Sequence, residues 1–238
     1  MKYKSYKKSD DYSYVFGAFP VIELLENSPE IIREIIISEK YNEIDELVGK
    51  LETKGIKYSI SDKSIRRIAD KGNIYLIAVF DKKRGRIEDG NHIVLHEPSD
   101  MGNLGTIIRT MLGFGFRDLA IVGNSCDHFN PKVIRASMGA FFKINIEYFE
   151  DIDDYLNKFK DREIYSFILS SDNQKKLVDI KSCGRYSLIF GNEGSGLPTK
   201  FESIGDSVLI PQSEDVDSLN LTIAAAVAMF WFKENVEI

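Results

Sequence analysis

Short apolar segments that alternate with helical segments constrain this chain more than any other feature. The runs His92–Leu95, Asp118–Val122 and Ser187–Phe190 have the length and composition of strands buried on both faces. Helical patterns at 102–114 and 131–138 separate such runs along the chain. Strands joined by crossover helices favour a mostly parallel sheet with helices on both faces, so the predicted fold class is α/β.

The same alternation extends through the rest of the chain. Further strands are expected at Ile144–Tyr148, Tyr165–Leu169 and Ser207–Ile210, and further helices at Asp151–Phe159 and Ser218–Phe232. Nearer the N-terminus, helices are expected at Ala18–Glu26, Ile44–Lys54 and Ser64–Asp70, and strands at Glu34–Ser38, Lys57–Ile60 and Ile74–Phe80. This earlier part of the chain therefore predicts a smaller α/β unit of its own.

A charged segment, Asp81–Gly90, separates the two parts. It contains two glycines and lies between apolar runs, as domain linkers commonly do. We therefore predict a small α/β domain over residues 1–86 and a larger domain over 87–238. A chain of 238 residues is long enough for both to bury a core.

The net charge of −6 is unevenly distributed. Residues 1–86 hold 17 basic and 14 acidic side chains, whereas the remainder holds 14 and 23. Basic clusters at Lys2–Lys8, Arg66–Arg67 and Lys82–Arg86 can supply phosphate contacts, which need local rather than global charge. The alternative is a solvated surface with a charged linker, and composition alone favours it.

The sequence gives no sign of a membrane or metal protein. No apolar run follows the basic N-terminus, so a secretory signal is not expected. The longest apolar stretch, Ile223–Phe232, is too short to span a bilayer and predicts a core helix. Cys126 and Cys183 match no metal-binding spacing, and His92 and His96 lack a third ligand, so we expect reduced thiols, no metal and a cytoplasmic location.

Three polar, glycine-containing loops follow predicted strands, where α/β sheets bind their ligands. The first, Glu97–Arg109, places Asn103 and Arg109 around a helix start. Asn103 could simply bond to the helix terminus and Arg109 could be a surface cation. That second explanation is the weaker one, because Arg109 has apolar neighbours in the sequence.

The second loop runs from the apolar strand Ser187–Phe190 through Gly191, Gly194 and Gly196. Its glycines leave backbone groups available to a ligand. It is not a P-loop, because no Gly-Lys-Ser/Thr follows, and the chain has no dinucleotide-binding Gly-x-Gly-x-x-Gly after its first strand. A tight turn could explain two of the glycines, but it does not explain Glu193 among them.

The third loop, Ile210–Asn220, leads into the apolar C-terminal helix. Ser218 has the side chain of an ordinary N-cap. Asn220 is then one of the first residues inside the helix, where asparagine is unfavourable.

Together the three loops resemble the motifs of the SpoU/TrmH family of RNA ribose 2′-O-methyltransferases, in the SPOUT superfamily. The first motif is Asn103-Leu-Gly-Thr-Ile-Ile-Arg109-Thr110, the second Phe190-Gly-Asn-Glu193-Gly-Ser-Gly196, and the third Ile210-Pro through Ser218-Leu-Asn220. They occur in the family order, and Ser137–Ala140 resembles a further recurrent stretch. More loosely, the segment from Gly17 to Leu25 resembles the start of the ribosomal-protein-like substrate-binding domain of many members.

The resemblance implies a C-terminal trefoil knot that binds S-adenosylmethionine in a bent form, and a homodimer with its sites near the interface. It implies catalytic roles for Arg109, Asn103, Glu193, Ser218 and Asn220. It implies cofactor contacts from Phe190, Gly191, Asn192, Gly196, Ile210, Pro211, Gln212 and Leu219. Gln212 and Glu214 stand where many members carry Met and Gly, so the third loop is more acidic than the family pattern.

By this resemblance, Arg109 engages the ribose 2′-hydroxyl. Because a guanidinium stays protonated in proteins, we expect it to stabilise a developing alkoxide, with a substrate phosphate as a candidate proton acceptor. Asn103 and Glu193 are expected to orient it, and Ser218 and Asn220 to shape the pocket. Ribosomal RNA is the expected substrate and transfer RNA the alternative. Two other functions remain open: an RNA-binding module without catalysis, and a nucleotide-dependent phosphotransferase, which the missing P-loop lysine disfavours.

Overall fold

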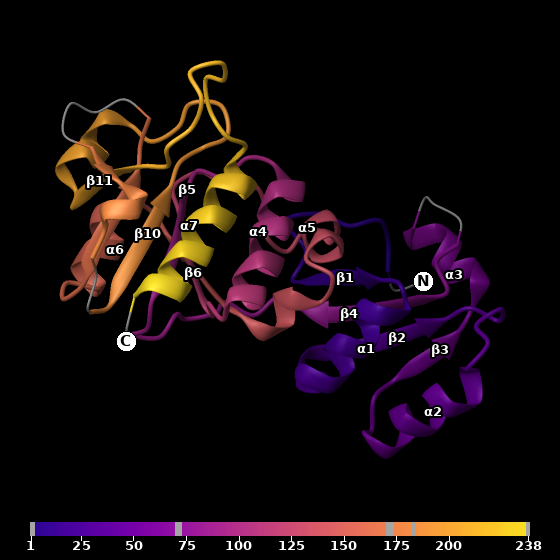
Figure 1. The fold of residues 1–238 in the computed structure, drawn as a ribbon. Coiled ribbons are helices and arrows are strands. Elements are labelled where there is room, and N and C mark those ends of the chain that lie inside the picture. The colour runs from indigo at the N-terminus through magenta and orange to yellow at the C-terminus, as the bar shows by residue number, and fades with distance from the viewer. Residues whose placement is uncertain (1–2, 70–72, 170–173, 182–183, 237–238) are drawn as a thin grey trace. The chain divides into compact units, whose positions relative to one another are not determined.

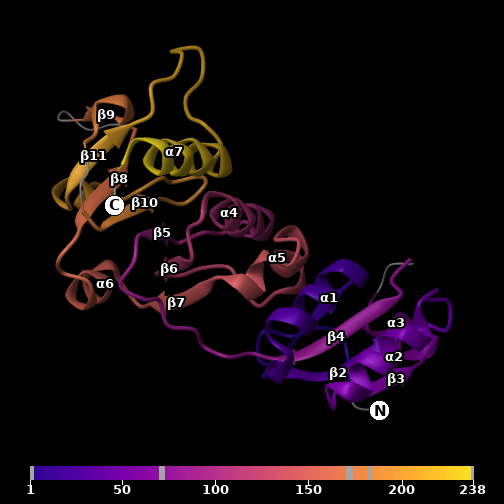
Figure 2. The same cartoon turned by 60° about the horizontal axis from the view of Figure 1, so that its bottom comes forward.

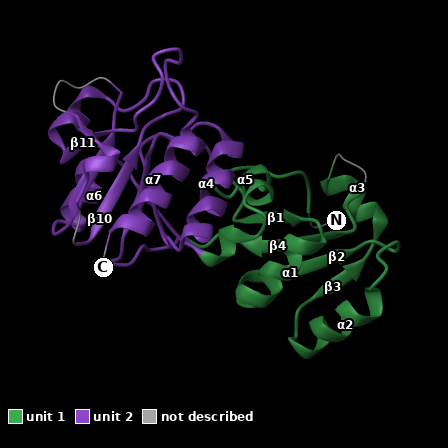
Figure 3. Cartoon of the chain, in the orientation of Figure 1, with its two compact units in different colours: residues 1–83, 127–143 green, residues 84–126, 144–238 purple. Residues whose placement is uncertain are grey.

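The computed structural model describes residues 3–69, 73–169, 174–181 and 184–236. Its chain forms two compact units, shown in different colours in Figure 3. Unit 1 contains residues 1–83 and 127–143, and unit 2 contains residues 84–126 and 144–238. Both units are α/β structures, and Figure 1 shows the elements of each.

Unit 2 is built on a seven-stranded sheet in the order β7-β6-β5-β10-β8-β11-β9, and every recorded strand pair in it is parallel. Its strands are β5 (His92–His96), β6 (Asp118–Val122), β7 (Asn145–Phe149), β8 (Glu163–Phe167), β9 (Lys175–Lys176), β10 (Tyr186–Phe190) and β11 (Asp206–Leu209). The predicted parallel sheet is confirmed. The sequence missed only β9 in this unit, because two consecutive lysines do not resemble a buried strand.

Helices cover both faces of this sheet, as Figure 2 shows. On one face lie α4 (Met101–Phe114) and α7 (Leu221–Asn235), and the Phe232 ring of α7 packs 4.9 Å from that of Tyr165 and 4.7 Å from that of Tyr186. On the other face, α6 (Ile152–Lys158) joins the core cluster of Val94 and Ile189. Two covered faces explain why the central strands β5, β6 and β10 are mainly apolar and are buried along their whole length.

The helix boundaries follow from capping groups, and one of them corrects the sequence prediction. Gly115, with φ of 86°, ends α4 in the left-handed conformation, directly after the predicted helix 102–114. Asn130 caps α5 (Pro131–Ala136), where its side chain accepts from the Lys132 N–H. Helix α7 begins at Leu221 and its N-cap is Asn220, so the predicted start at Ser218 is wrong. Asparagine is a preferred N-cap, which removes the apparent anomaly of Asn220 inside a helix.

Unit 1 contains a mixed four-stranded sheet in the order β1-β4-β2-β3. Its strands are β1 (Tyr12–Phe16), β2 (Ile32–Ile37), β3 (Tyr58–Ile60) and β4 (Leu76–Asp81), and its helices include α1 (Ala18–Asn27), α2 (Ile44–Thr53) and α3 (Asp62–Ile68). Strands β2 and β3 pair in parallel, whereas β4 is antiparallel to both β1 and β2. The sequence missed β1, whose polar N-terminal surroundings conceal the strand.

The segment 127–143 belongs to unit 1, although the predicted division at residue 86 places it in the C-terminal domain. It contributes α5 and a short helix at Ala140–Lys143. The Phe80 ring of β4 packs edge-on against Phe142 at 5.3 Å, and the Ser13 hydroxyl donates to the Phe129 carbonyl. The chain therefore passes between the two units three times rather than once.

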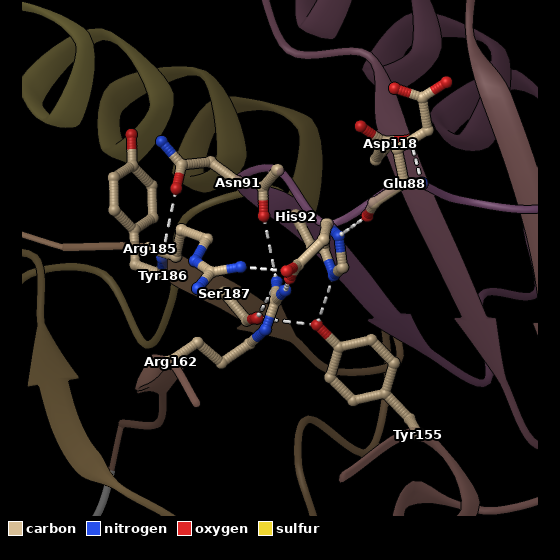
Figure 4. A network of polar contacts seen from close by, with 11 residues as sticks. Glu88, Asn91, His92, Asp118, Tyr155, Arg162, Arg185, Tyr186 and Ser187 are labelled. Carbon is tan, nitrogen blue, oxygen red and sulfur yellow. Dashed lines mark hydrogen bonds and ion pairs between the residues drawn. The ribbon is translucent and has the colours of Figure 1, made fainter. Parts of the chain in front are cut away.

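A buried polar network lies at the amino ends of β5 and β10, shown in Figure 4. The His92 Nε2 lies 2.6 Å from the Glu88 carbonyl oxygen, which can only accept, so Nε2 carries the proton. The Tyr155 hydroxyl must then donate to His92 Nδ1 at 2.7 Å, and it accepts from Ser187 at 2.6 Å. Arg162 donates to the Ser187 hydroxyl and to the Gly90 carbonyl.

This network keeps His92 neutral and anchors the chain where it enters unit 2. Burial, helped by the positive charge of Arg162, lowers the pKa of His92 to about 4. The Arg162 side chain is only 1% exposed, and it pairs with Asp89 at 2.8 Å. His96, the other histidine of β5, packs 4.9 Å from the Phe201 ring instead. Both histidines thus have structural surroundings, and no candidate metal cluster occurs among the described residues.

Removing the Tyr155 hydroxyl should cost stability out of proportion to its size. In Tyr155→Phe, the buried Nδ1 of His92 loses its donor, which should lower the free energy of unfolding by about 1–3 kcal/mol. Urea denaturation measures the loss. The control is Tyr148→Phe, whose ring is 52% exposed. Equal effects of the two substitutions would refute the role given to the network.

Candidate active site

A cavity of about 260 Å³ opens beyond the carboxyl ends of β8, β10 and β11 in unit 2. This is the edge at which parallel α/β sheets bind ligands. Three segments line it: 167–169, 190–197 and 208–224. Two of them are the second and third loops that the sequence singled out. Residues 167–169 were missed as site residues, although they form the carboxyl end of the predicted strand Tyr165–Leu169 and the same edge rule could have found them.

The glycine loop after β10 folds back on itself. Asn192 and Gly196 exchange two backbone hydrogen bonds of 3.1 and 3.0 Å, which close the loop. A Cβ at position 191 would lie 2.2 Å from the Gly196 carbonyl carbon, so only glycine fits there. The Asn192 carboxamide oxygen accepts from the backbone N–H groups of Gly194 and Ser195. The loop is therefore more than a tight turn, because an internal side chain holds it rigid.

Glu193 joins this loop to the first one. Its carboxylate accepts from the Ser99 N–H at 3.0 Å, the Ser99 hydroxyl at 2.7 Å and the Asp100 N–H at 3.1 Å. The Asn103 carboxamide approaches the same carboxylate at 3.4 Å. Partial burial acts to raise the pKa of Glu193, but the hydrogen bonds from Ser99 and Asp100 outweigh it and hold that pKa below its usual value. The carboxylate is thus an ionised clamp between the two loops.

Arg109 lies apart from this clamp. It is exposed on α4, one turn from Thr106 and Gly113, which are exposed as well. Within the part of the chain that the structure describes, its guanidinium has no recorded hydrogen bond or ion pair. The structure brings Asn103 and Glu193 together, and it records no contact of either with Arg109.

The third loop combines a helix cap with the wall of the cavity. The Asn220 side-chain oxygen accepts from the Thr222 N–H at 2.8 Å and from its hydroxyl at 2.6 Å. Ser218 lines the cavity and is not the cap. Gln212 donates weakly to the Asp217 carbonyl at 3.4 Å. The acidic side chain of Glu214 in this loop is exposed.

Most residues expected to contact a cofactor do line the cavity. They are Phe190, Gly191, Asn192, Gly196, Ile210, Gln212 and Leu219, whereas Pro211 is not among the lining residues. The Phe190 ring stacks on that of Phe167 at 4.6 Å, which gives the cavity an aromatic wall at one side. Backbone groups of the glycine loop and apolar side chains therefore dominate the lining, a composition suited to a small organic ligand.

Comparison with known proteins identifies the family. Residues 90–230 match the model of the SpoU rRNA Methylase family, and residues 14–73 match the RNA 2′-O ribose methyltransferase substrate-binding domain. The chain therefore belongs to the SpoU rRNA methylase family. No helix among the described residues has both the length and the apolar character that a membrane span requires.

Several relatives are similar over most of their length. The 23S rRNA (guanosine(2553)-2′-O)-methyltransferase RlmP of Bacillus subtilis is 24% identical over 213 residues, which cover 88% of this chain and 84% of the relative. The AdoMet-bound rRNA methyltransferase of Sinorhizobium meliloti superposes with a TM-score of 0.81 at 24% identity, covering 94% and 87% of the two chains. The AdoMet complex of AviRb from Streptomyces viridochromogenes gives 0.82 at 20% identity, covering 94% and 90%. These structures share the fold.

Neutralising Glu193 should loosen the clamp. Glu193→Gln keeps the shape, but its amide can accept at only one oxygen, so the free energy of unfolding at pH 7 should fall by about 1–3 kcal/mol. Because the folded-state pKa is lowered, wild type loses this advantage as the pH falls below the ordinary value of 4.5, and the two proteins should converge there.

Denaturation curves at several pH values test this expectation. The matched control is Glu202→Gln, an exposed carboxylate with no recorded partner among the described residues, which should be neutral. A difference between Glu193→Gln and wild type that did not change with pH would contradict the clamp.

Proposed function

We propose that this protein transfers a methyl group from S-adenosylmethionine to a ribose 2′-hydroxyl in ribosomal RNA. The observation that carries the proposal is the cavity at the carboxyl ends of β8, β10 and β11, bounded by the second and third family loops, with Glu193 tying the first loop to the second. The 23S rRNA 2′-O-methyltransferase activity in the names of RlmP and RlmB supports this choice of substrate.

The cavity suits S-adenosylmethionine by the groups it presents. Phe190, Ile210 and Leu219 offer apolar surface for an adenine ring, and the closed glycine loop offers backbone donors and acceptors for polar groups. The exposed acidic side chains of the third loop favour a ligand that carries positive charge. When bound, the cofactor supplies a methyl group already activated on a sulfonium.

The residues must then align the ribose oxygen with that methyl group and stabilise the charge that develops on it. Arg109 is the proposed catalytic residue, because a permanently protonated guanidinium stabilises an alkoxide in the transition state. The Arg109 side chain is exposed and has no recorded partner among the described residues, so it is available to contact RNA when the substrate binds. A phosphate of the substrate is the proposed proton acceptor.

The other predicted residues act through the loops. Asn103 and Glu193 fix the N-terminal end of α4 and so position Arg109, which lies further along the same helix. Asn220 fixes the start of α7, and Ser218 faces the cavity beside Leu219. We propose that the chain is knotted where the three lining segments meet, as the family resemblance implies.

We propose that the active form is a cytoplasmic homodimer. On α7, Ile223 is 52%, Val227 38% and Phe230 54% exposed. Their spacing places them on one face of the helix, and a stripe of this kind is expected to be covered. Because α7 packs against α4, a dimer formed on this stripe would also place α4, the helix that carries Arg109, near the interface.

Arg109→Ala should reduce kcat for methyl transfer to ribosomal RNA by about 100- to 1000-fold, the usual cost of losing one group that stabilises an oxyanion. S-adenosylmethionine affinity should stay within about twofold, since Arg109 is not among the residues that line the cavity. Transfer of labelled methyl groups measures the first quantity and calorimetry the second. The control is Arg135→Ala, an exposed arginine of α5.

Wild-type activity in the Arg109 variant would refute the assignment. Methylation of transfer RNA but not ribosomal RNA by wild type would replace the proposed substrate. Mapping 2′-O-methyl groups in total RNA with and without the gene then identifies the nucleotide.

A charge in the α7 stripe should separate the subunits. Val227→Lys places an ammonium within the proposed interface, so light scattering should detect monomers where wild type gives dimers. Val178→Lys is the control, because Val178 is 62% exposed and lies outside the stripe. A monomeric wild type, or a variant that stays dimeric, would contradict this interface.

A further inference from the structure

The residues that precede β1 form a strap on unit 1. We use this name for residues 3–11, which fold back against Lys82 and the start of segment 127–143. The Tyr6 hydroxyl donates to the Asp127 carboxylate. The Lys82 ammonium donates to the Lys8 carbonyl at 3.0 Å, and the Lys82 N–H to the Asp11 carbonyl at 3.0 Å. The strap and Lys82 both lie outside the two matched family regions, 14–73 and 90–230.

This part of unit 1 carries more basic than acidic side chains. Lys7, Lys8 and Lys83 are exposed, and none of their ammonium groups has a recorded partner in the described chain. The nearby acidic groups are already engaged: Arg33 pairs with both Asp11 and Asp81.

Asp127 is engaged as well, because it accepts from Tyr6 and from the Phe129 N–H. Asp10 is the remaining carboxylate of the strap, and it is partly buried. Among the described residues the ammonium groups of Lys7, Lys8 and Lys83 have no recorded contact, so they are available to an anionic partner.

Aromatic rings lie between these charges. The Lys82 ammonium is 4.5 Å from the centre of the Tyr6 ring and 5.9 Å from that of Phe129. The His128 ring lies 4.2 Å from that of Phe129, and burial lowers the pKa of His128 to about 4, so this ring is neutral at physiological pH. The rings of Tyr6, His128 and Phe129 are each partly exposed.

A surface on which cations alternate with partly exposed aromatic rings suits the binding of unpaired nucleotides. The ammonium groups contact phosphates, and the rings offer surfaces to bases that a duplex would keep stacked. A duplex would use only the charges, since its bases are already stacked.

We infer that the surface formed by Lys7, Lys8, Lys82 and Lys83 with Tyr6, His128 and Phe129 binds a single-stranded segment of the RNA substrate. We call it the strap surface. This inference rests on the proposed function for the identity of the polyanion. Its lysines and Tyr6 lie outside the two matched family regions, whereas His128 and Phe129 lie within residues 90–230.

The test is the salt dependence of RNA binding by the full-length protein. The probe is a fluorescent 20-nucleotide single-stranded RNA, titrated between 0.05 and 0.2 M salt. The triple variant Lys7→Gln, Lys8→Gln, Lys83→Gln should reduce the magnitude of the negative slope of log affinity against log salt by about 2, since each lost phosphate contact removes about 0.7 for a single strand. Its Kd at 0.15 M salt should rise by about 10-fold or more.

The control variant, Lys40→Gln, Lys54→Gln, Lys160→Gln, removes the same charge from exposed positions elsewhere and should keep the wild-type slope. S-adenosylmethionine affinity should be equal in all three proteins, which verifies folding. In competition assays on the wild-type protein, the single strand should bind about 10-fold more tightly than a duplex of the same sequence.

An unchanged slope in the strap-surface variant, with wild type active in methyl transfer, overturns the inference alone. If both variants show the same salt slope, smaller in magnitude than that of wild type, the inference is also overturned, because net charge would then explain the effect. A duplex that competes as well as the single strand overturns the role of the rings. Failure of wild type to bind S-adenosylmethionine instead refutes the proposed function.

Discussion

The candidate site depends on one carboxylate. Glu193 projects from the loop after β10 and accepts from the N–H groups of Ser99 and Asp100, the two residues directly before α4, so two segments distant in the sequence become one rigid edge. The closed glycine loop presents this side chain, and Gly191 permits that closure because a Cβ there would strike the backbone of Gly196. Binding of a small molecule at this edge thus requires little reorganisation. A preorganised site loses less binding free energy to the ordering of its own groups.

Arg109 and the cavity occupy different places in unit 2. The cavity and its clamp are complete within unit 2, whereas the group expected to act on the ribose lies on the exposed side of α4. In the proposed mechanism, cofactor binding and chemistry therefore depend on different residues. The resemblance implies that Asn103 and Glu193 orient Arg109, and in the structure their contacts lie at the start of the helix that carries Arg109.

The sequence predicted the parts of the fold that depend on local periodicity. The apolar strands of unit 2 and the helix end at Gly115 were readable because burial on both faces and a left-handed glycine leave clear patterns. The start of α7 was misplaced because Ser218 and Asn220 are both good caps, and only the tertiary position of the loop decides between them. Strand β1 and the membership of segment 127–143 in unit 1 depend on long-range packing against Phe80 and Ser13, for which no local pattern exists. The lining residues of the second and third loops came from motifs, but 167–169 did not.

The three passages of the chain between the units affect how such a protein can change over time. A domain joined by one linker can be gained, lost or exchanged by a single recombination event. Here, a cut at residue 86 would leave unit 1 without α5 and without the ring of Phe142 that packs on Phe80. It would also leave segment 127–143 attached to unit 2 without the residues against which it packs. An exchange of unit 1 would therefore have to carry segment 127–143 together with the first 83 residues.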